Sequence, residues 1–326
     1  MNDAIHEHPL AGMFNRLSPE QVLGAVEVGG RRCTGRFIVL NSYENRVYQL
    51  ELEDESWVVG KFYRPGRWST ETILDEHSFL AELVAEEIPV AAPLDLGDGT
   101  LGEVDGILYS LFPRIGGRNP EELDDEQTRM VGRLIARIHN VGARRDAPHR
   151  LRLSTETYGR KNLRFLVETG ALPPEAKDNY LATCEALFDR IEPLLAEVPV
   201  HRIHGDCHPG NLIRTRDGFT FLDFDDMLVG PAVQDVWMLV PSYDDFGRRQ
   251  REVLIEAYEG IRRFETRWLS LVEPLRALRF VHYSTWVARR WDDPVFKRTF
   301  SHFGDLRYWQ QEIQDLREQI ARLDPY

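Results

Sequence analysis

Residues 204–211 read HGDCHPGN, and residues 219–225, a little further along the chain, read FTFLDFD. The first segment contains the pattern H-x-D-x-x-x-x-N, which is typical of the catalytic loop of phosphoryl-transfer enzymes. In that chemistry an aspartate accepts the proton of an attacking hydroxyl group, and an asparagine on the same loop reaches a metal ion bound to phosphate. The spacing therefore predicts that Asp206 is a catalytic base and that Asn211 is a metal ligand.

Two other interpretations of residues 204–211 stay open. Several of these side chains could bind a metal ion, but groups this close in sequence cannot easily converge on one tetrahedral ion. Alternatively, the segment is a polar turn in which Pro209 and Gly210 interrupt regular structure. The residues that follow help to choose between these interpretations.

Residues 219–225 form an apolar strand that ends in Asp-Phe-Asp. A carboxylate at the end of a strand beside the catalytic loop is where a second magnesium ligand must lie, and Asp223 holds that position. An acidic turn is the alternative, since Asp225 and Asp226 follow. The order and separation of the two segments favour phosphoryl transfer, with Mg²⁺ bound by Asn211 and Asp223.

A lysine upstream is a candidate contact for ATP. Residues 58–62 read VVGKF, which resembles the kinase strand whose lysine contacts the α- and β-phosphates and pairs with a glutamate on the next helix. Lys61 occupies the position of that lysine. The alternative is a lysine on the surface of an edge strand, which is a common feature.

The helix expected at residues 70–87 carries a carboxylate on its apolar face. At about 100° per residue, Glu76 falls inside the apolar arc, whereas Glu71 and Glu82 fall outside it and are expected to face water. An unpaired buried charge is costly, so Glu76 needs a cationic partner. Lys61 is available, and the sequence therefore predicts a Lys61–Glu76 ion pair. The apolar arc consists of Ile73, Leu80, Leu83 and Val84.

The order of expected elements indicates an α+β chain with two lobes and a cleft between them. A segment rich in Pro and Gly at residues 113–117 is the expected boundary. We therefore expect a sheet-rich, nucleotide-binding N-lobe at residues 1–115 and a helical C-lobe with the catalytic loop at residues 116–326. Strands are expected at residues 37–40, 46–52, 57–63, 107–112, 202–204 and 219–224, and helices at residues 70–87, around 130–138, at 175–195 and from 232 onward.

Composition limits the class of protein. The 326 residues have a formal net charge of −13, which disfavours nucleic-acid binding because that binding depends on Lys and Arg. The same acidity suits a cationic substrate or simply aids solubility. The three cysteines are widely spread and predict no disulfide framework. Residues 1–12 lack the pattern of a signal peptide, and no apolar run is long enough to span a membrane. We expect a cytoplasmic monomer that binds neither membranes nor nucleic acid.

The four segments together resemble the bacterial stress-response kinase A family, which lies within the aminoglycoside phosphotransferase and choline kinase superfamily. The resemblance is specific at residues 40–48 (LNSYENRVY), 61–65 (KFYRP), 204–208 (HGDCH) and 230–235 (GPAVQD), and it extends from about residue 15 to about residue 320. It implies a protein-kinase-like fold and a Ser/Thr protein kinase that depends on ATP and Mg²⁺ and autophosphorylates.

The loop between the first two strands departs from the protein-kinase pattern. Protein kinases cover the phosphates with G-x-G-x-x-G, whereas residues 41–45 read NSYEN. The resemblance implies that Ser42 contacts the ATP phosphates from this loop, and a hydroxyl group can donate to phosphate oxygens. A simple polar hairpin turn is the alternative. The resemblance also implies that Asp235 accepts backbone N–H groups of the catalytic loop.

Two features of the sequence predict different classes of acceptor. Only six residues separate Asp223 from Gly230, so there is no long activation segment of the kind that docks peptides in eukaryotic-type protein kinases. This favours a small-molecule kinase that acts on an aminoglycoside-, choline- or homoserine-like hydroxyl group. The resemblance instead implies a protein with Ser or Thr hydroxyl groups, which is our main expectation. A nucleotide-binding pseudokinase is a further alternative, but the complete set of Lys61, Asp206, Asn211 and Asp223 disfavours it.

Overall fold

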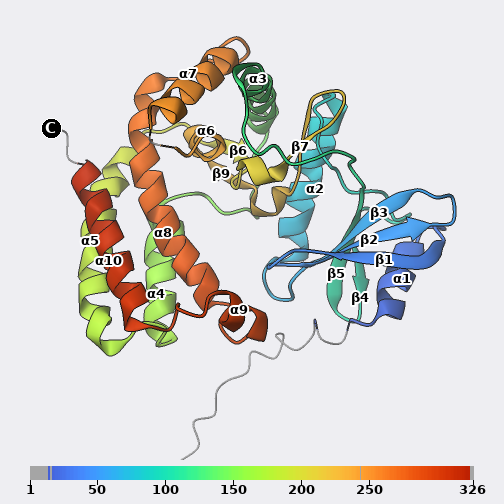
Figure 1. The fold of residues 1–326 in the computed structure, drawn as a ribbon, viewed down its shortest axis with the longest axis horizontal. Helices are drawn as coiled ribbons and strands as arrows, with labels where there is room; N and C mark the ends of the chain where they lie inside the picture. The colour runs from blue at the N-terminus through green and yellow to red at the C-terminus, as the bar shows by residue number, and fades with distance from the viewer. Residues whose placement is uncertain (1–13, 15–16, 243, 324–326) are drawn as a thin grey trace, which may run out of the picture.

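The computed structural model describes residues 14, 17–242 and 244–323, and these form a sheet-rich N-lobe and a helical C-lobe (Figure 1). The expected α+β class is therefore confirmed. The expectation about a signal peptide concerned residues 1–12, which lie outside the described residues. In the part of the chain that is described, no helix combines the length and the apolar character needed to cross a membrane. The three cysteines are free.

The N-lobe is built on a five-stranded antiparallel sheet with the strand order β1-β2-β3-β5-β4. Helix α1 (Pro19–Glu27) contributes Val22 and Val26 to the same core as Leu50 and Leu111 of the sheet. The register pairs Lys61 of β3 with residues in the two neighbouring strands, which places it in the middle of the sheet rather than at an edge. The strands are β1 (Cys33–Leu40), β2 (Arg46–Leu52), β3 (Trp57–Phe62), β4 (Gly102–Val104) and β5 (Ile107–Pro113).

Helix α2 (Thr70–Ala85) connects the two lobes. Its residues Phe79, Leu80 and Leu83 belong to the core of the C-lobe, although the helix lies in the N-terminal part of the chain. Two expectations for this helix were wrong. Val84 is 49% exposed, and the carboxylate of Glu82 does not face water but forms an ion pair of 2.7 Å with the buried guanidinium of Arg202. The buried arginine needs a counter-charge, and the C-lobe therefore covers a side of α2 that its own sequence marks as polar.

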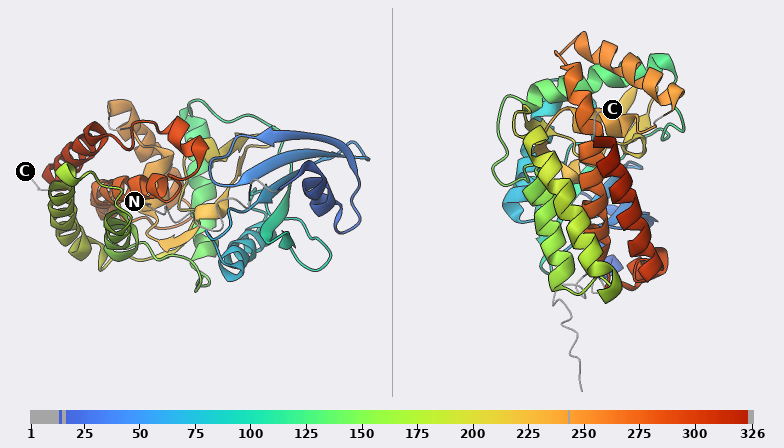
Figure 2. Two further views of the ribbon diagram at one scale, coloured as in Figure 1. Left: turned by 90° about the horizontal axis from the view of Figure 1, so that it is seen from below. Right: turned by 90° about the vertical axis from the view of Figure 1, so that its left-hand side faces the viewer.

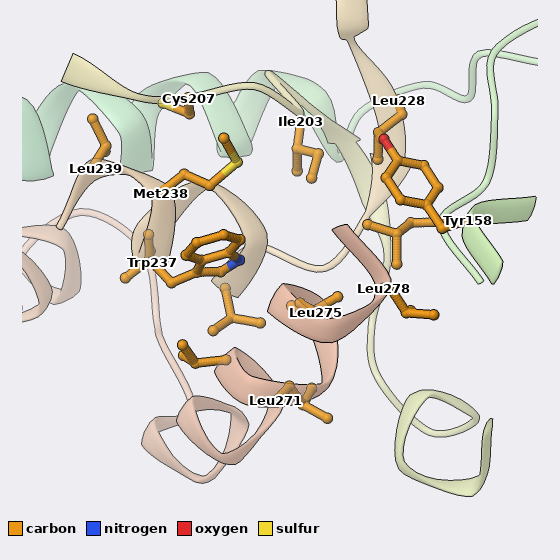
Figure 3. Close-up of a cluster of buried hydrophobic side chains, with 14 of the residues drawn as sticks. Tyr158, Ile203, Cys207, Leu228, Trp237, Met238, Leu239, Leu271, Leu275 and Leu278 are labelled. Carbon is orange, nitrogen blue, oxygen red and sulfur yellow. The ribbon is translucent and has the colours of Figure 1, made fainter. Parts of the chain in front are cut away.

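The C-lobe is a helical layer in which α4, α5, α8 and α10 run side by side (Figure 2). Beneath the catalytic loop, leucines of α8 pack with Trp237 and Met238 of α6 and with Ile203 and Cys207 (Figure 3). This core fixes α8 against the segment that carries Asp206. The helices are α3 (Asp125–Gly142), α4 (Lys161–Glu168), α5 (Pro174–Leu195), α6 (Val233–Leu239), α7 (Asp245–Glu259), α8 (Val272–Ala288), α9 (Pro294–Thr299) and α10 (Leu306–Leu323).

Two short antiparallel pairs of strands frame the catalytic loop. β6 (His201–Ile203) pairs with β9 (Leu228–Gly230), and β7 (Leu212–Arg214) pairs with β8 (Phe219–Phe221). The strand expected at residues 219–224 ends earlier, because the chain turns at Asp223 into a short 3-10 helix. The loop therefore enters and leaves through paired strands, which hold its two ends.

Glu312 gives a pH-dependent contribution to the packing of α10 on α8. Its carboxylate accepts a hydrogen bond of 2.7 Å from Ser284, and burial raises its pKa to about 7. A carboxyl group whose folded-state pKa is raised stabilises the fold below its unfolded-state pKa and loses that contribution as the pH rises through 7. We therefore expect the stability of Glu312→Gln, relative to the natural chain, to improve by roughly 1–3 kcal/mol between pH 5 and pH 8.

Urea unfolding of both chains at the two pH values measures this difference. The matched control is Glu318→Gln, which changes an exposed glutamate on the same helix. A relative stability of Glu312→Gln that is as independent of pH as that of the control contradicts the assignment of a raised pKa to Glu312.

Candidate active site

The catalytic loop is fixed by one buried carboxylate. Asp235, at the start of α6, accepts hydrogen bonds of 2.9 Å from the backbone N–H groups of both His204 and Gly205, and its Oδ2 lies 3.0 Å from Nε2 of His139. The expected contact between Asp235 and the loop is thus confirmed. Gly205 has a φ of +84°, and a Cβ atom there would lie 2.2 Å from the carbonyl oxygen of Asp226, so only glycine fits. The loop is therefore held in one conformation just before Asp206.

Residues 222–226 (LDFDD), called the acidic segment below, are joined to the catalytic loop through Leu222. Its N–H donates to the carbonyl oxygen of Asn211, and its own carbonyl oxygen accepts a hydrogen bond of 2.9 Å from Nε2 of His204. The next residue, Asp223, has a φ of 56° and lies in the left-handed region. Residues other than glycine seldom adopt this conformation, and it often marks a functional position. The two predicted metal ligands, Asn211 and Asp223, therefore lie on segments that are hydrogen-bonded to each other.

The carboxylate of Asp206 is held by two basic side chains. Arg279 of α8 lies 2.7 Å from Oδ1, and Nε2 of His208 lies 3.4 Å from Oδ2. Burial opposes ionisation, but His208 and Arg279 outweigh it and hold the pKa of Asp206 well below its usual value. Asp206 is therefore an ionised carboxylate that can accept a proton, and it is aimed by groups on both sides.

Lys61 of β3 contacts the acidic segment of the C-lobe. Its Nζ lies 2.8 Å from Asp223 and 3.2 Å from Asp225. Burial alone would lower the pKa of the ammonium group, but the two carboxylates overcome this and raise it. The side chain of Lys61 is 9% exposed, so a strong cation is kept in a nearly closed position beside Asp223.

The predicted Lys61–Glu76 ion pair was wrong for this structure. Within the described residues, the carboxylate of Glu76 instead forms its ion pair with Arg150, at 2.8 Å, and both side chains are fully buried. Arg150 also donates to the carbonyl oxygens of Asp225, within the acidic segment, and of Met227, directly after it. The expectation that Glu76 is buried and needs a cation was right, but the cation comes from the C-lobe.

The loop at residues 41–45 is bound to this same cluster. The hydroxyl group of Ser42 accepts a hydrogen bond of 3.2 Å from the N–H of Asn45, which closes the turn. The side chain of Asn45 then donates to Asp225 at 3.1 Å. Glu44 accepts from the indole N–H of Trp286 at 2.8 Å and pairs with Arg290, both at the end of α8. The loop therefore crosses from the N-lobe to α8, beside the carboxylates that Lys61 contacts.

The donor set fits a hard divalent cation. The side-chain amide of Asn211 donates through its nitrogen to the carbonyl oxygen of Asp206, which leaves Oδ1 available as a ligand. Asp223 uses Oδ1 for Lys61, and its side chain is 55% exposed. Mg²⁺ commonly takes one or two protein oxygens and completes its shell with phosphates and water. Within the described residues no group of three or more His, Cys, Asp or Glu side chains could hold an ion by itself, and this disfavours the alternative in which the side chains of residues 204–211 bind a metal ion on their own.

Residues 37–271 match the phosphotransferase enzyme family. The chain belongs to this phosphotransferase family. It is 40% identical over 311 residues to stress response kinase A of Salmonella choleraesuis (strain SC-B67), which covers 95% of this chain and 94% of that protein. It is 39% identical, with the same coverage, to serine/threonine protein kinase RdoA of Salmonella typhimurium (strain LT2). The resemblance predicted from the sequence is thus confirmed, and the chain is a phosphotransferase of the kinase type.

A solved member of the same fold supports the two-lobed architecture. Amicoumacin kinase hAmiN, in complex with AMP-PNP, Ca²⁺ and Ami, has a TM-score of 0.74 to this structure at 18% sequence identity. The match covers 93% of this chain and 95% of the amicoumacin kinase chain. At this identity the similarity establishes the fold, and the acceptor has to be argued from the residues of this phosphotransferase itself.

Sequence reasoning missed three residues that hold this site together. Asp225 was visible as the second aspartate of the Asp-Phe-Asp segment but was assigned only to an acidic turn. Arg150 and Arg279 lie far from the motifs in the sequence, and no local pattern marks them. A search for cations on elements that face the catalytic loop would have found Arg279, which lies on a helix rich in apolar residues.

Proposed function

We propose that this phosphotransferase moves the γ-phosphoryl group of ATP to a serine or threonine hydroxyl group of a protein, and that it also phosphorylates itself. The observation that carries the proposal is the contact of 2.8 Å between Lys61 and Asp223, at a point where Asp223 is joined to the loop of Asp206 and Asn211. A lysine, a base and two metal ligands in one cluster are what phosphoryl transfer needs. The name of the Salmonella typhimurium relative favours a protein acceptor.

Each polar group has a distinct task in the proposed reaction. Lys61 and Ser42 bind the phosphates of ATP, and Asp206 orients the acceptor hydroxyl group and takes its proton. Asn211 and Asp223 would hold Mg²⁺, which would supply positive charge to offset the negative charge of the phosphates. Glu76 acts from a distance, because its pair with Arg150 fixes α2 against the acidic segment. The rate enhancement comes mainly from positioning and preorganised charge.

The metal assignment predicts a change in the magnesium requirement. Asp223→Ala and Asn211→Ala each remove an oxygen ligand, so we expect both variants to need at least about tenfold more Mg²⁺ for half-maximal activity, besides losing rate. Magnesium titration at saturating ATP measures this. Asp217→Ala, which changes an exposed aspartate in the turn between β7 and β8, is the control. An unchanged half-saturation in the two site variants counts against metal ligation.

The acceptor class is tested with labelled ATP. We expect the purified chain with Mg²⁺ to place label on serine or threonine residues of itself and of a test protein, and mass spectrometry identifies the modified residues. Omission of Mg²⁺ is the control for metal dependence. Turnover of a small alcohol without any phosphoserine or phosphothreonine would show that the chain is a small-molecule kinase instead. Absence of any ATP turnover would favour the alternative of a pseudokinase that binds nucleotide without transferring phosphate.

A small-molecule acceptor is the second candidate, and the site offers one specific observation in its favour. The segment from Asp223 to α6 is short, with a 3-10 turn at Phe224–Asp226 followed directly by β9. It leaves no long chain for docking a peptide.

The remaining expectations stay proposals. The lobe boundary at residues 115 and 116 is supported by the end of β5 at Pro113 and the start of α3 at Asp125. A cytoplasmic monomer that binds neither membranes nor nucleic acid suits an ATP-dependent enzyme of this charge.

A further inference from the structure

A large cavity between the C-lobe helices and residues 64–68 of the N-lobe adjoins the candidate active site. Its volume is about 940 Å³, and its wall includes Asp226 of the acidic segment, Tyr158, Lys161 of α4, and the C-terminal half of α8. Tyr158 stacks on His282 with the ring centroids 4.2 Å apart. A cavity of this size accommodates several residues of an extended chain or one drug-sized molecule. Nothing in the proposed chemistry of ATP uses it.

One face of α8 runs from the candidate base into this cavity. Arg279, His282, Trp286 and Arg289 follow one another at intervals of three or four residues, which places them on one side of a helix. The first bonds Asp206, and the other three line the cavity. The cavity wall therefore begins about one helical turn along α8 from the arginine that bonds Asp206.

The wall of the cavity is cationic, although the chain as a whole is acidic. It carries five Lys or Arg side chains and two carboxylates. The carboxylate of Asp226 is already paired with Arg67, and Asp292 is exposed. The net charge of the whole chain therefore does not describe the charge that a ligand meets here.

Two of these cations have no carboxylate partner among the described residues. Arg289 lies over the ring of Phe165, with its guanidinium carbon 4.0 Å from the ring centroid, and partial burial lowers its pKa. Lys161 is exposed on the facing helix α4 and likewise forms no ion pair with a described carboxylate. Because a partly desolvated guanidinium without an ion-pair partner favours binding of an anion, and Lys161 adds a second positive charge to the same wall, the far part of the cavity is suited to a carboxylate or a phosphate.

We propose that this cavity binds an anionic side chain of the acceptor polypeptide, either a carboxylate or a phosphate, and so selects acidic substrates. The inference rests on the proposed protein-kinase function and names its substrate class. Arg279 and Arg289 lie about 15 Å apart along the helix axis at 1.5 Å per residue. An extended peptide spans this length in about four to five residues. The anionic side chain therefore lies about four to five positions from the phosphorylated serine or threonine.

The test uses the full-length chain, Mg-ATP, and matched serine peptides that carry either glutamate or lysine at those positions. We expect the KM of the glutamate peptide to be at least about tenfold lower at low salt, and the difference to shrink as salt is raised. Charge reversal by Arg289→Glu or Lys161→Glu should raise the KM of the glutamate peptide by about tenfold and lower that of the lysine peptide. The rate at saturating peptide should change little.

A matched control separates this effect from a change in total charge. Arg133→Glu reverses an exposed arginine on α3, which is not part of the cavity wall, and should leave both KM values unchanged. Equal KM values for the two peptides, or a preference for the lysine peptide, overturn the inference but leave protein phosphorylation standing. Failure to phosphorylate any peptide, with turnover of a small alcohol, overturns the proposed function itself. In that case, comparison of a phosphorylated with an unmodified alcohol shows whether the cavity serves a small anion.

Discussion

Replacement of Asp206 by asparagine is expected to lower the rate of phosphoryl transfer by roughly 10²–10⁴-fold and to leave ATP binding nearly unchanged. An amide has nearly the same shape as the carboxylate and can still accept the hydrogen bond that Arg279 donates, which is 2.7 Å long. It cannot accept the proton of the attacking hydroxyl group. In the proposed reaction Lys61 and Ser42 hold the phosphates, so the loss should appear in kcat rather than in the affinity for ATP.

Single-turnover transfer from labelled ATP measures the rate of the Asp206→Asn variant, and calorimetric titration with a non-hydrolysable ATP analogue measures its binding. Asp217→Asn makes the same chemical change at an exposed position between β7 and β8 and serves as the control. If Asp206→Asn keeps activity within about threefold of the natural chain, Asp206 is not the base. A matching loss of nucleotide affinity would instead indicate that the loop has been distorted.

The parts of the site that could be predicted from the sequence are those whose functional residues lie close together in short segments. The spacing between Asp206 and Asn211 is set by one loop, and Asp223 ends a strand that pairs next to that loop. In both cases a local pattern restricts which groups can meet, because few residues lie between them. The contact between Asp235 and the N–H groups of the catalytic loop spans 31 and 30 residues, and it was expected from the family resemblance rather than from a local pattern.

Ion-pair partners could not be predicted in this way. The helical pattern correctly placed Glu76 on a buried face, but it could not identify the cation that meets it, because Arg150 lies 74 residues later in the chain. Glu82 and Arg202 are 120 residues apart. Which cation reaches a buried carboxylate depends on how the C-lobe packs on α2, and periodicity contains no information about that packing.

Short elements were missed for a different reason. Strands β7 and β9 have three residues each, which is too few for alternation to be recognised, and they exist because they pair with neighbours. Helix α1 did carry a readable signal. Ser18 and Gln21 form a capping box and Pro19 occupies the first turn, a combination that marks the start of a helix.

Removal of the guanidinium of Arg150 is expected to cost about 3–5 kcal/mol of stability, because it removes the ion-pair partner of the buried carboxylate of Glu76 and leaves that carboxylate only the more distant charge of Lys61. The side chains of both residues are almost completely inaccessible, and they are 2.8 Å apart. Arg150 also donates to the carbonyl oxygens of Thr72, Asp225 and Met227. The variant Arg150→Met keeps much of the volume, so the loss measures charge and hydrogen bonds rather than a cavity.

Urea unfolding at neutral pH compares Arg150→Met with Arg152→Met, which removes an arginine whose side chain is 56% exposed and whose partner Asp146 is 61% exposed. An exposed pair of this kind contributes at most about 1 kcal/mol. Addition of Glu76→Gln to Arg150→Met should recover part of the loss, because the buried amide needs no counter-charge. Equal stabilities of Arg150→Met and Arg152→Met, or no recovery in the double variant, would show that the Glu76–Arg150 pair does not anchor α2 to the acidic segment. The recovered double variant also separates the two roles of α2: if it folds well but needs more ATP for half-maximal activity, the charge of Glu76 serves nucleotide binding as well as stability.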